Sequence, residues 1–133
     1  EEIELFMKEF IRRIQEYLGE VTEEKEDVKL YDRIIAYLEE HYKEDIDYEE
    51  AAENIGISYS YMRRVVKEGG DISMVDYVNR LRIREAKKLL LTTDLKIPDI
   101  AGMVGYHNVQ SLNRFFKKYE GTTPNGVRDL GKK

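Results

Sequence analysis

Two short segments of the chain carry arginine, lysine and amide side chains at helical spacing, and these groups suit contacts with nucleic acid. Arginine can form paired hydrogen bonds with guanine, and glutamine or asparagine can do so with adenine, whereas lysine suits phosphate oxygens. The first segment covers residues 60–67 and the second covers residues 110–118. Together they give the candidate DNA-binding residues Ser60, Tyr61, Arg63, Arg64, Lys67, Gln110, Ser111, Asn113, Arg114, Lys117 and Lys118.

Both segments lie in a sequence that occurs twice. Ala52–Lys67 contains Ala-x-x-x-Gly-Ile followed by Met-x-Arg-Val-Val-Lys, and Ala101–Lys117 contains Ala-x-x-x-Gly-Tyr followed by Leu-x-Arg-Phe-Phe-Lys. The copies start 49 positions apart, and the second has one extra residue after its glycine. Each copy predicts a helix, a tight turn and a second helix, which is the layout of a helix-turn-helix. In that motif the second helix lies in the DNA major groove.

Small residues stand where the two helices of each copy must cross and turn. Ala52 and Ala101 allow close approach, and Gly56 and Gly105 suit the left-handed backbone that often follows a helix. Six apolar side chains are expected to fill the crevices between the helices, namely Ile55, Ile57, Met62, Val104, Tyr106 and Leu112. The outward faces of the second helices are then left to the candidate DNA-binding residues.

A long helix is predicted between the two copies, from Ser73 to about Leu91. Ser73-x-x-Asp76 is a capping-box pattern, and Ser58 and Asn108 are expected to cap the two second helices in the same way. The inward face of the long helix is expected to carry Met74, Val78, Leu81, Ala86, Leu89 and Leu90. About 19 residues at ~1.5 Å each span roughly 28 Å, which is comparable to the ~34 Å of one DNA turn. One chain could therefore reach two adjacent major grooves.

The stretch Tyr77–Lys118 resembles the signature of the AraC/XylS transcription regulators. The matching motifs are Tyr-Val-Asn-Arg-Leu-Arg-Ile-Arg-Glu-Ala-Lys-Lys-Leu-Leu from Tyr77, Asp-Leu-Lys-Ile-Pro-Asp-Ile-Ala from Asp94, Val-Gly-Tyr from Val104, Asn-Arg-Phe-Phe-Lys-Lys-Tyr from Asn113, and Thr123-Pro124. The resemblance covers about residues 30–128, and a signature of this length is highly specific.

The resemblance implies an all-α fold with two helix-turn-helix subdomains joined by a long linker helix. It implies seven helices in residues 29–133, in addition to an N-terminal amphipathic helix. The first helix-turn-helix is expected at about residues 48–68, the linker helix at 73–91 and the second helix-turn-helix at 97–119. The implied function is sequence-specific binding of double-stranded DNA by a transcription regulator. The residues that match base-contacting or phosphate-contacting positions of the family are Ser60, Arg63, Arg64, Gln110, Ser111, Asn113 and Arg114.

Four places depart from the family pattern. Val66 stands where the family usually has an aromatic residue, Gly69-Gly70 stands where it has a polar pair that continues the helix, and Asp71 stands where it usually has a glycine. We therefore expect the second helix of the first unit to end early or to pack loosely near Gly69 and Gly70. After Thr123-Pro124 the family continues with an acidic and an aromatic residue, whereas Asn-Gly-Val follows here. The last helix is expected to be short and weak.

The distribution of charge resolves an apparent conflict with DNA binding. The net charge of the chain is −5, although phosphate contacts supply most nonspecific affinity for DNA. Residues 1–28 hold 4 basic and 10 acidic side chains, and residues 29–56 hold 3 and 9. Residues 57–133 hold 15 basic and 8 acidic side chains. The positive charge therefore accompanies the proposed reading helices.

The N-terminal 28 residues predict an amphipathic connector helix followed by a charged linker. Apolar residues recur with heptad steps of 4, 3, 4, 3 and 4 at Ile3, Met7, Phe10, Ile14, Tyr17 and Val21. Gly19 and the run from Thr22 to Asp27 are expected to form the helix end and a solvated linker. The apolar seam predicts either a homodimer contact or packing within the chain.

The composition limits the possible location and function of the protein. The 133 residues contain no Cys, no apolar run of ~18 residues and no visible signal peptide, so we expect a cytoplasmic chain without a membrane span. We expect no cofactor, and no metal site, because His41 and His107 lie in different units. No catalytic motif supports an enzyme. The sequence begins without Met inside a helical pattern, so we expect a fragment whose upstream sensory or receiver domain is absent. The alternative is a protein-docking adaptor that uses its acidic helical surface.

Overall fold

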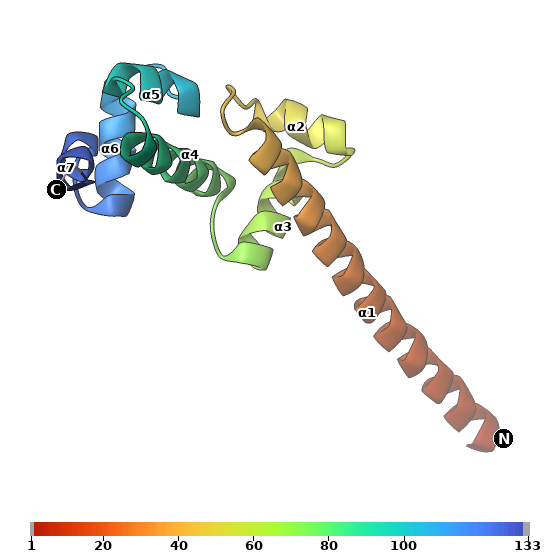
Figure 1. Ribbon diagram of the computed structural model, residues 1–133. Helices are drawn as coiled ribbons and strands as arrows, with labels where there is room; N and C mark the ends of the chain where they lie inside the picture. The colour runs from red at the N-terminus through yellow and green to blue at the C-terminus, as the bar shows by residue number, and fades with distance from the viewer. Residues whose placement is uncertain (1, 132–133) are drawn as a thin grey trace.

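The computed structural model describes residues 2–131, apart from the side chains of residues 20–24, and this part of the chain contains seven α-helices and no strand. The helices are α1 (Glu2–His41), α2 (Tyr48–Ile55), α3 (Tyr59–Gly70), α4 (Met74–Thr92), α5 (Ile97–Val104), α6 (Val109–Glu120) and α7 (Pro124–Gly131). The all-α fold is confirmed, with α2–α3 and α5–α6 as the two helix-turn-helix units and α4 as the linker helix. In Figure 1, α1 projects from the first unit, and α4 leads to the second.

The first helix corrects one prediction. α1 is continuous over 40 residues, so neither the helix end at Gly19 nor the linker at residues 22–27 is observed. The run after Gly19 is rich in Glu and Lys and contains no proline, and these residue types favour a helix even when no face of it is apolar. The connector helix and the first domain helix are therefore one element, which gives seven helices in place of eight. The division into residues 1–28 and 29–133 stays a prediction.

The core of the first unit lies between the second half of α1, the helices α2 and α3, and the N-terminal part of α4. Its buried side chains are Ile34, Leu38, Ala51, Ala52, Met62, Val65, Val66, Met74 and Val78. The early end expected for α3 is wrong, because α3 and α6 each have twelve residues. A Cβ at Gly69 would lie 2.5 Å from the ring of Tyr31, so the glycine gives this α1 tyrosine its place against α3.

The second unit has its own core, formed by α4, α5 and α6. The buried side chains are Ile83, Ala86, Leu90, Ile100, Ala101, Val104, Tyr106, Leu112 and Phe116. α7 is short, as expected, and the guanidinium of Arg128 ties it to α4 by donating to the carbonyls of Leu90 (3.3 Å) and Thr93 (3.1 Å).

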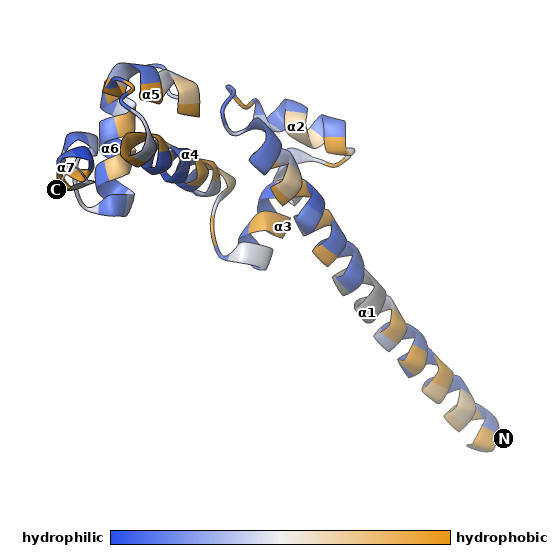
Figure 2. Cartoon of the chain, in the orientation of Figure 1, coloured by the Kyte–Doolittle hydropathy of each residue, from blue (hydrophilic) through white to orange (hydrophobic). Residues whose placement is uncertain are grey.

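The apolar seam of α1 is exposed in its N-terminal half. Ile3, Met7, Phe10, Ile14 and Tyr17 are all solvent-exposed, and Figure 2 shows apolar residues along this part of the helix. Val21, the next residue of the seam, lies outside the described side chains. From residue 30 onward one face of the same helix is buried against α3, so α1 joins a packed half to a half whose described seam residues are exposed.

Candidate nucleic-acid interface

The turn of each helix-turn-helix is built on a left-handed glycine, as predicted. Gly56 has φ +92° and Gly105 has φ +112°. The Gly56 N–H donates to the carbonyl of Ala52 (2.9 Å), and in the second unit the N–H of Tyr106 donates to the carbonyl of Ala101 (2.9 Å). These bonds close the first helix of each unit and direct the chain into the second helix.

Side-chain caps fix the start of both second helices and of the linker helix. Ser58 Oγ accepts the N–H of Tyr61 (3.1 Å), and Asn108 Oδ1 accepts the N–H of Ser111 (2.8 Å). Ser73 Oγ accepts the N–H of Asp76 (3.1 Å). The three predicted caps are confirmed. The N-termini of α3 and α6 keep further free N–H groups and partial positive charge that suit phosphate.

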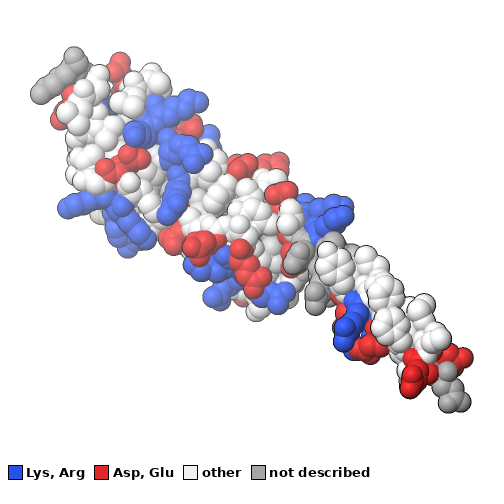
Figure 3. All heavy atoms as spheres, turned by 90° about the horizontal axis from the view of Figure 1, so that it is seen from below, with Lys and Arg blue, Asp and Glu red and all other residues white. Residues whose placement is uncertain are grey.

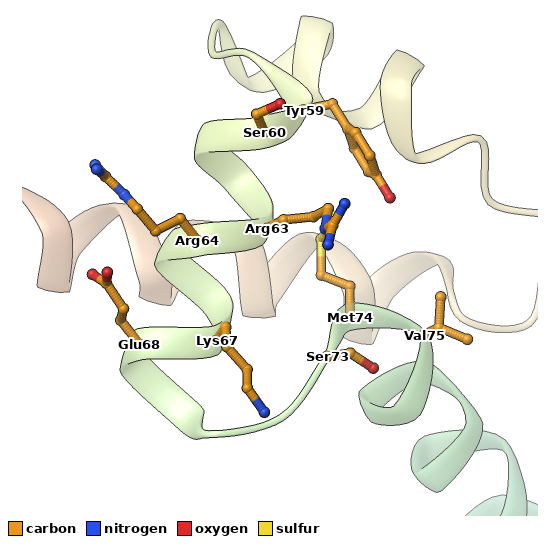
Figure 4. Close-up of a pocket in the computed structure, with 9 residues that line it drawn as sticks. All are labelled: Tyr59, Ser60, Arg63, Arg64, Lys67, Glu68, Ser73, Met74 and Val75. Carbon is orange, nitrogen blue, oxygen red and sulfur yellow. The ribbon is translucent and has the colours of Figure 1, made fainter.

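α3 presents four of its five candidate residues to solvent: Ser60, Arg63, Arg64 and Lys67. Together with Tyr59, Glu68 and the start of α4 they line a groove (Figure 4). In this view Arg63 points toward Met74, whereas Arg64 and Glu68 point to the other side of α3. The Arg63 guanidinium lies 5.8 Å from the centre of the Tyr59 ring, a cation–π contact that holds its stem against the unit.

Tyr61 differs from the other candidates of α3 because it faces α1. Its hydroxyl donates a 2.6 Å hydrogen bond to Asp27 Oδ1, and its side chain is half-buried. That hydrogen bond to a carboxylate raises the pKa of the Tyr61 hydroxyl. The guanidinium of Arg64 lies 4.9 Å from the centre of the Tyr61 ring. Asp27 thus supports Arg64 through Tyr61, a connection that depends on α1 remaining helical past residue 27.

α6 presents its candidate residues in the same register as α3. Gln110, Asn113, Arg114, Lys117 and Lys118 are exposed, and Ser111 is half-buried. The Arg114 guanidinium lies 4.7 Å from the ring centre of its neighbour Phe115, and Lys118 Nζ lies 3.6 Å from Asp76 Oδ1 of α4. Lys118 is therefore directed toward the linker helix, at the edge of the outward face.

The half of the molecule that holds α4 to α7 carries an excess of positive side chains. Figure 3 shows Lys and Arg gathered over this half, with fewer acidic side chains among them. Acidic side chains are more prominent over the middle of the molecule and at the N-terminal end of α1. On this face the positive side chains gather over α4 to α7, which make up most of the basic segment 57–133.

Both histidines face carboxylates across short distances. His41 Nδ1 lies 3.0 Å from Glu44, and His107 Nε2 lies 2.7 Å from Asp45. Among the side chains that the structure describes, no group of three or more potential metal-binding residues comes together. In the same range no helix has the length and apolar character needed to cross a membrane.

Sequence reasoning missed Arg82, which contacts both units. It lies 49 positions after Arg33, the same offset that separates Ala52 from Ala101, so the repeat extends beyond the helix-turn-helix segments. The sequence therefore contained an arginine repeated at equivalent places. It did not show that the two arginines have different partners: Arg33 bonds within its own unit, whereas Arg82 bonds to the other unit.

The sequence of the chain is similar to a known protein family and to known transcription regulators. A family model described as a helix-turn-helix domain matches residues 51–129. The bifunctional transcriptional activator/DNA repair enzyme AdaA of Bacillus subtilis (strain 168) is 33% identical over 111 residues, which is 84% of this chain and 53% of that protein. The chain spans 53%, 13% and 37% of three curated relatives, all transcription regulators by name.

Solved structures share the fold. The C-terminal domain of AraT, a response regulator from Geobacillus stearothermophilus, superposes with a TM-score of 0.73 at 32% identity, covering 76% of this chain and 84% of that one. The DNA-binding domain of AdpA, solved in complex with a target DNA, gives a TM-score of 0.70 at 23% identity, covering 75% and 90%. At that identity the second match supports the arrangement of helices alone.

Proposed function

Because the chain belongs to the AraC/XylS family of helix-turn-helix transcription regulators, we propose that α3 and α6 enter successive major grooves of double-stranded DNA and read its sequence. The observation that carries this proposal is the matching register of the two exposed faces. Each face has a capped N-terminus, an arginine at Arg64 or Arg114 and a lysine at Lys67 or Lys117. A single such face is common on solvated helices, whereas two in the same register suit one continuous duplex.

The linker helix suits this arrangement in length. α4 has 19 residues, and at ~1.5 Å per residue it spans roughly 28 Å. One turn of DNA is ~34 Å, so the two reading helices reach neighbouring major grooves most easily if the DNA bends toward the protein. Bending would add a contribution to specificity from base pairs that the protein never touches.

The proposed roles divide the candidate residues into two groups. Arg63, Arg114 and the amides Gln110 and Asn113 read base edges, because their donors and acceptors can match those of guanine or adenine. The groups that set the register on phosphate are Ser60, Arg64, Lys67, Ser111, Lys117 and Lys118, together with the N-termini of α3 and α6. Tyr61, which is bonded to Asp27, contributes by supporting the guanidinium of Arg64.

No catalytic role is proposed for this chain, and no cofactor. Contact with chromosomal DNA implies a cytoplasmic location. The repair activity in the name of AdaA belongs to that protein, of which the chain spans 53%. An upstream sensory or receiver domain, reached through α1, would supply the signal that controls DNA binding.

Selection from a randomised duplex pool tests the proposal. The chain is bound to the pool at low and moderate salt, and the retained DNA is sequenced. We expect an enriched motif of two short blocks about one helical turn apart. Retention of no duplex at low salt would contradict the proposal and favour the alternative of a protein-docking adaptor. A single enriched block would show that only one recognition helix reads sequence.

Lys117 gives a prediction that separates phosphate contacts from base contacts. Replacing it by glutamine should weaken binding to all duplexes alike and should reduce the magnitude of the slope of log K against log salt by about 1. The slope is measured by titration at several salt concentrations. Lys8→Gln on the N-terminal half of α1 is the charge-matched control. A change in the selected bases would show that Lys117 reads sequence.

The exposed seam of α1 supports a second proposal, that the chain forms a homodimer through this helix. Phe10 and Ile14 lie in the seam, and the ion pairs that flank it join Arg12 to Glu9 and to Glu16. Apolar residues at heptad spacing, bordered by charged ones, are typical of a two-stranded coiled coil.

Replacing Phe10 by glutamate should shift the chain from dimer to monomer, because a charge in the seam would lose its water on association. Sedimentation equilibrium measures the shift. Gln15→Glu introduces the same charge on the face of α1 that points away from the seam and should leave the dimer intact. If the wild-type chain sediments as a monomer over the accessible concentration range, the seam does not form a homodimer.

A further inference from the structure

The side chain of Arg82 joins the second unit to the first. Its Nε donates a 2.7 Å hydrogen bond to the carbonyl of Tyr42, and its Nη2 donates a 2.9 Å bond to the carbonyl of Glu44. Tyr42 is the first residue after α1, which ends at His41, and Glu44 lies in the turn that follows. Carbonyls at the end of a helix lack partners within the helix and carry partial negative charge, so the guanidinium from α4 suits the Tyr42 carbonyl in particular.

Arg82 also lies against the turn that leads into the second recognition helix. Its guanidinium is 5.2 Å from the ring centre of Tyr106, and a Cβ at Gly105 would come within 2.8 Å of Arg82 Nε. The Tyr106 hydroxyl donates a buried 2.7 Å bond to Asn79 of α4. Two residues after Tyr106 the cap Asn108 begins α6. One side chain thus lies where the end of α1, the helix α4 and the turn before α6 meet.

Among the described residues, the other polar links to the end of α1 and the turn after it each have at least one exposed partner. These links are Tyr77 with Glu39 (2.8 Å), Lys43 with Glu85 (3.9 Å), and His107 with Asp45, which is exposed on both sides. Exposed ion pairs contribute little, because water and salt screen them. The half-buried Arg82 instead makes two short bonds from a charged donor, and such bonds are stronger than neutral ones.

We infer that Arg82 is a specificity-determining residue that fixes the spacing between the two DNA sites read by α3 and α6. The inference rests on the proposed function, in which both helices contact one duplex. It makes Arg82 a positioning residue, since it acts through the relative placement of the two units. A fixed joint lets the chain accept one spacing between the two sites, because any other spacing would have to break the bonds of Arg82 or deform the DNA.

Arg33 offers a matched control. It occupies the equivalent place in the first unit, 49 positions earlier, and is an arginine on the helix that precedes a helix-turn-helix. Its Nη2 donates to the carbonyl of Ile55 at 3.4 Å, within its own unit. Removing the guanidinium at either position changes the charge equally. Only at Arg82 does the change remove hydrogen bonds that join the two units.

The test uses duplexes that carry the two selected blocks, with the spacing between them changed by one or two base pairs in either direction. For the wild-type chain we expect tight binding at one spacing. For Arg82→Gln we expect the ratio of affinities between the preferred and the altered spacings to fall about tenfold, given the strength of two hydrogen bonds to a charged donor. Base preferences within each block should stay as they were, and Arg33→Gln should keep the wild-type ratio.

Several outcomes would overturn the inference or separate it from the proposed function. An unchanged spacing ratio in Arg82→Gln, with circular dichroism showing a folded chain, would exclude the role of Arg82. If Arg82→Gln does not fold, Arg82→Lys replaces it, because lysine keeps the charge but cannot bond both carbonyls in the same geometry, and an unchanged ratio there would also exclude the role. Selection of a single block by the wild-type chain would instead contradict the proposed double reading.

Discussion

Replacing Arg63 and Arg114 together by glutamine should remove most of the sequence preference of the chain. Each arginine projects from an exposed face of a recognition helix, and each guanidinium is steadied by a neighbouring ring, at 5.8 Å from Tyr59 and 4.7 Å from Phe115. An arginine that reads a guanine contributes about 1–3 kcal/mol of discrimination. Since the two residues lie on different helices and share no partner, their losses should add.

Binding titrations on the selected duplex, and on duplexes changed at single positions, measure this effect. Each single variant should lose preference at one position in one block, and the double variant should lose both. Arg13→Gln, on the exposed N-terminal half of α1, makes the same charge change away from the reading helices. Equal losses on every duplex would refute the assignment of Arg63 and Arg114 to bases and would place them on phosphates.

Replacing Gly105 by alanine should destabilise the chain more than replacing Gly56. Both glycines have positive φ, so alanine at either position costs about 1–2 kcal/mol through backbone strain. A Cβ at Gly56 would meet no atom within 4 Å, whereas at Gly105 it would lie 2.8 Å from the carbonyl oxygen of Tyr42 and 2.8 Å from Arg82 Nε. The first of these neighbours is backbone and cannot move aside without shifting the end of α1.

Denaturant unfolding of the two variants measures the difference. We expect the free energy of unfolding to fall by about 1–2 kcal/mol for Gly56→Ala and by roughly 2–4 kcal/mol for Gly105→Ala, where strain and overpacking act together. Gly102→Ala is the control, since Gly102 lies inside α5, has no neighbour within 4 Å of a Cβ and should gain helix propensity. Equal losses in the free energy of unfolding for the two variants would mean that the contact between the units adjusts to the added Cβ at little cost.

The sequence by itself determined the features that depend on neighbours along the chain. Gly56 and Gly105 are needed by the turns, and Ser58 and Asn108 cap the helices that follow, because these requirements involve only a few consecutive residues. The internal repeat then made two helix-turn-helix units evident. Helical periodicity was enough to separate most of the buried face of α3 from its outward face.

Contacts between helices distant in the sequence were decided only by the tertiary structure. The second half of α1 packs on α3, and no motif in the sequence indicated which side of α3 it would cover. The same packing turns Tyr61 toward Asp27. The helical spacing of Tyr61 had suggested an outward position, but spacing does not reveal which side a third helix covers.

Arg82 shows most clearly what could not be predicted from the sequence. The repeat makes it equivalent to Arg33, and the two sites differ only in what the fold brings near them. The end of α1 approaches Arg82 from 40 positions earlier in the chain and supplies the Tyr42 carbonyl that it caps. Local structure depends on neighbouring residues. The contact between the units depends on how two separately buried cores pack together, and no short stretch of sequence predicts that packing.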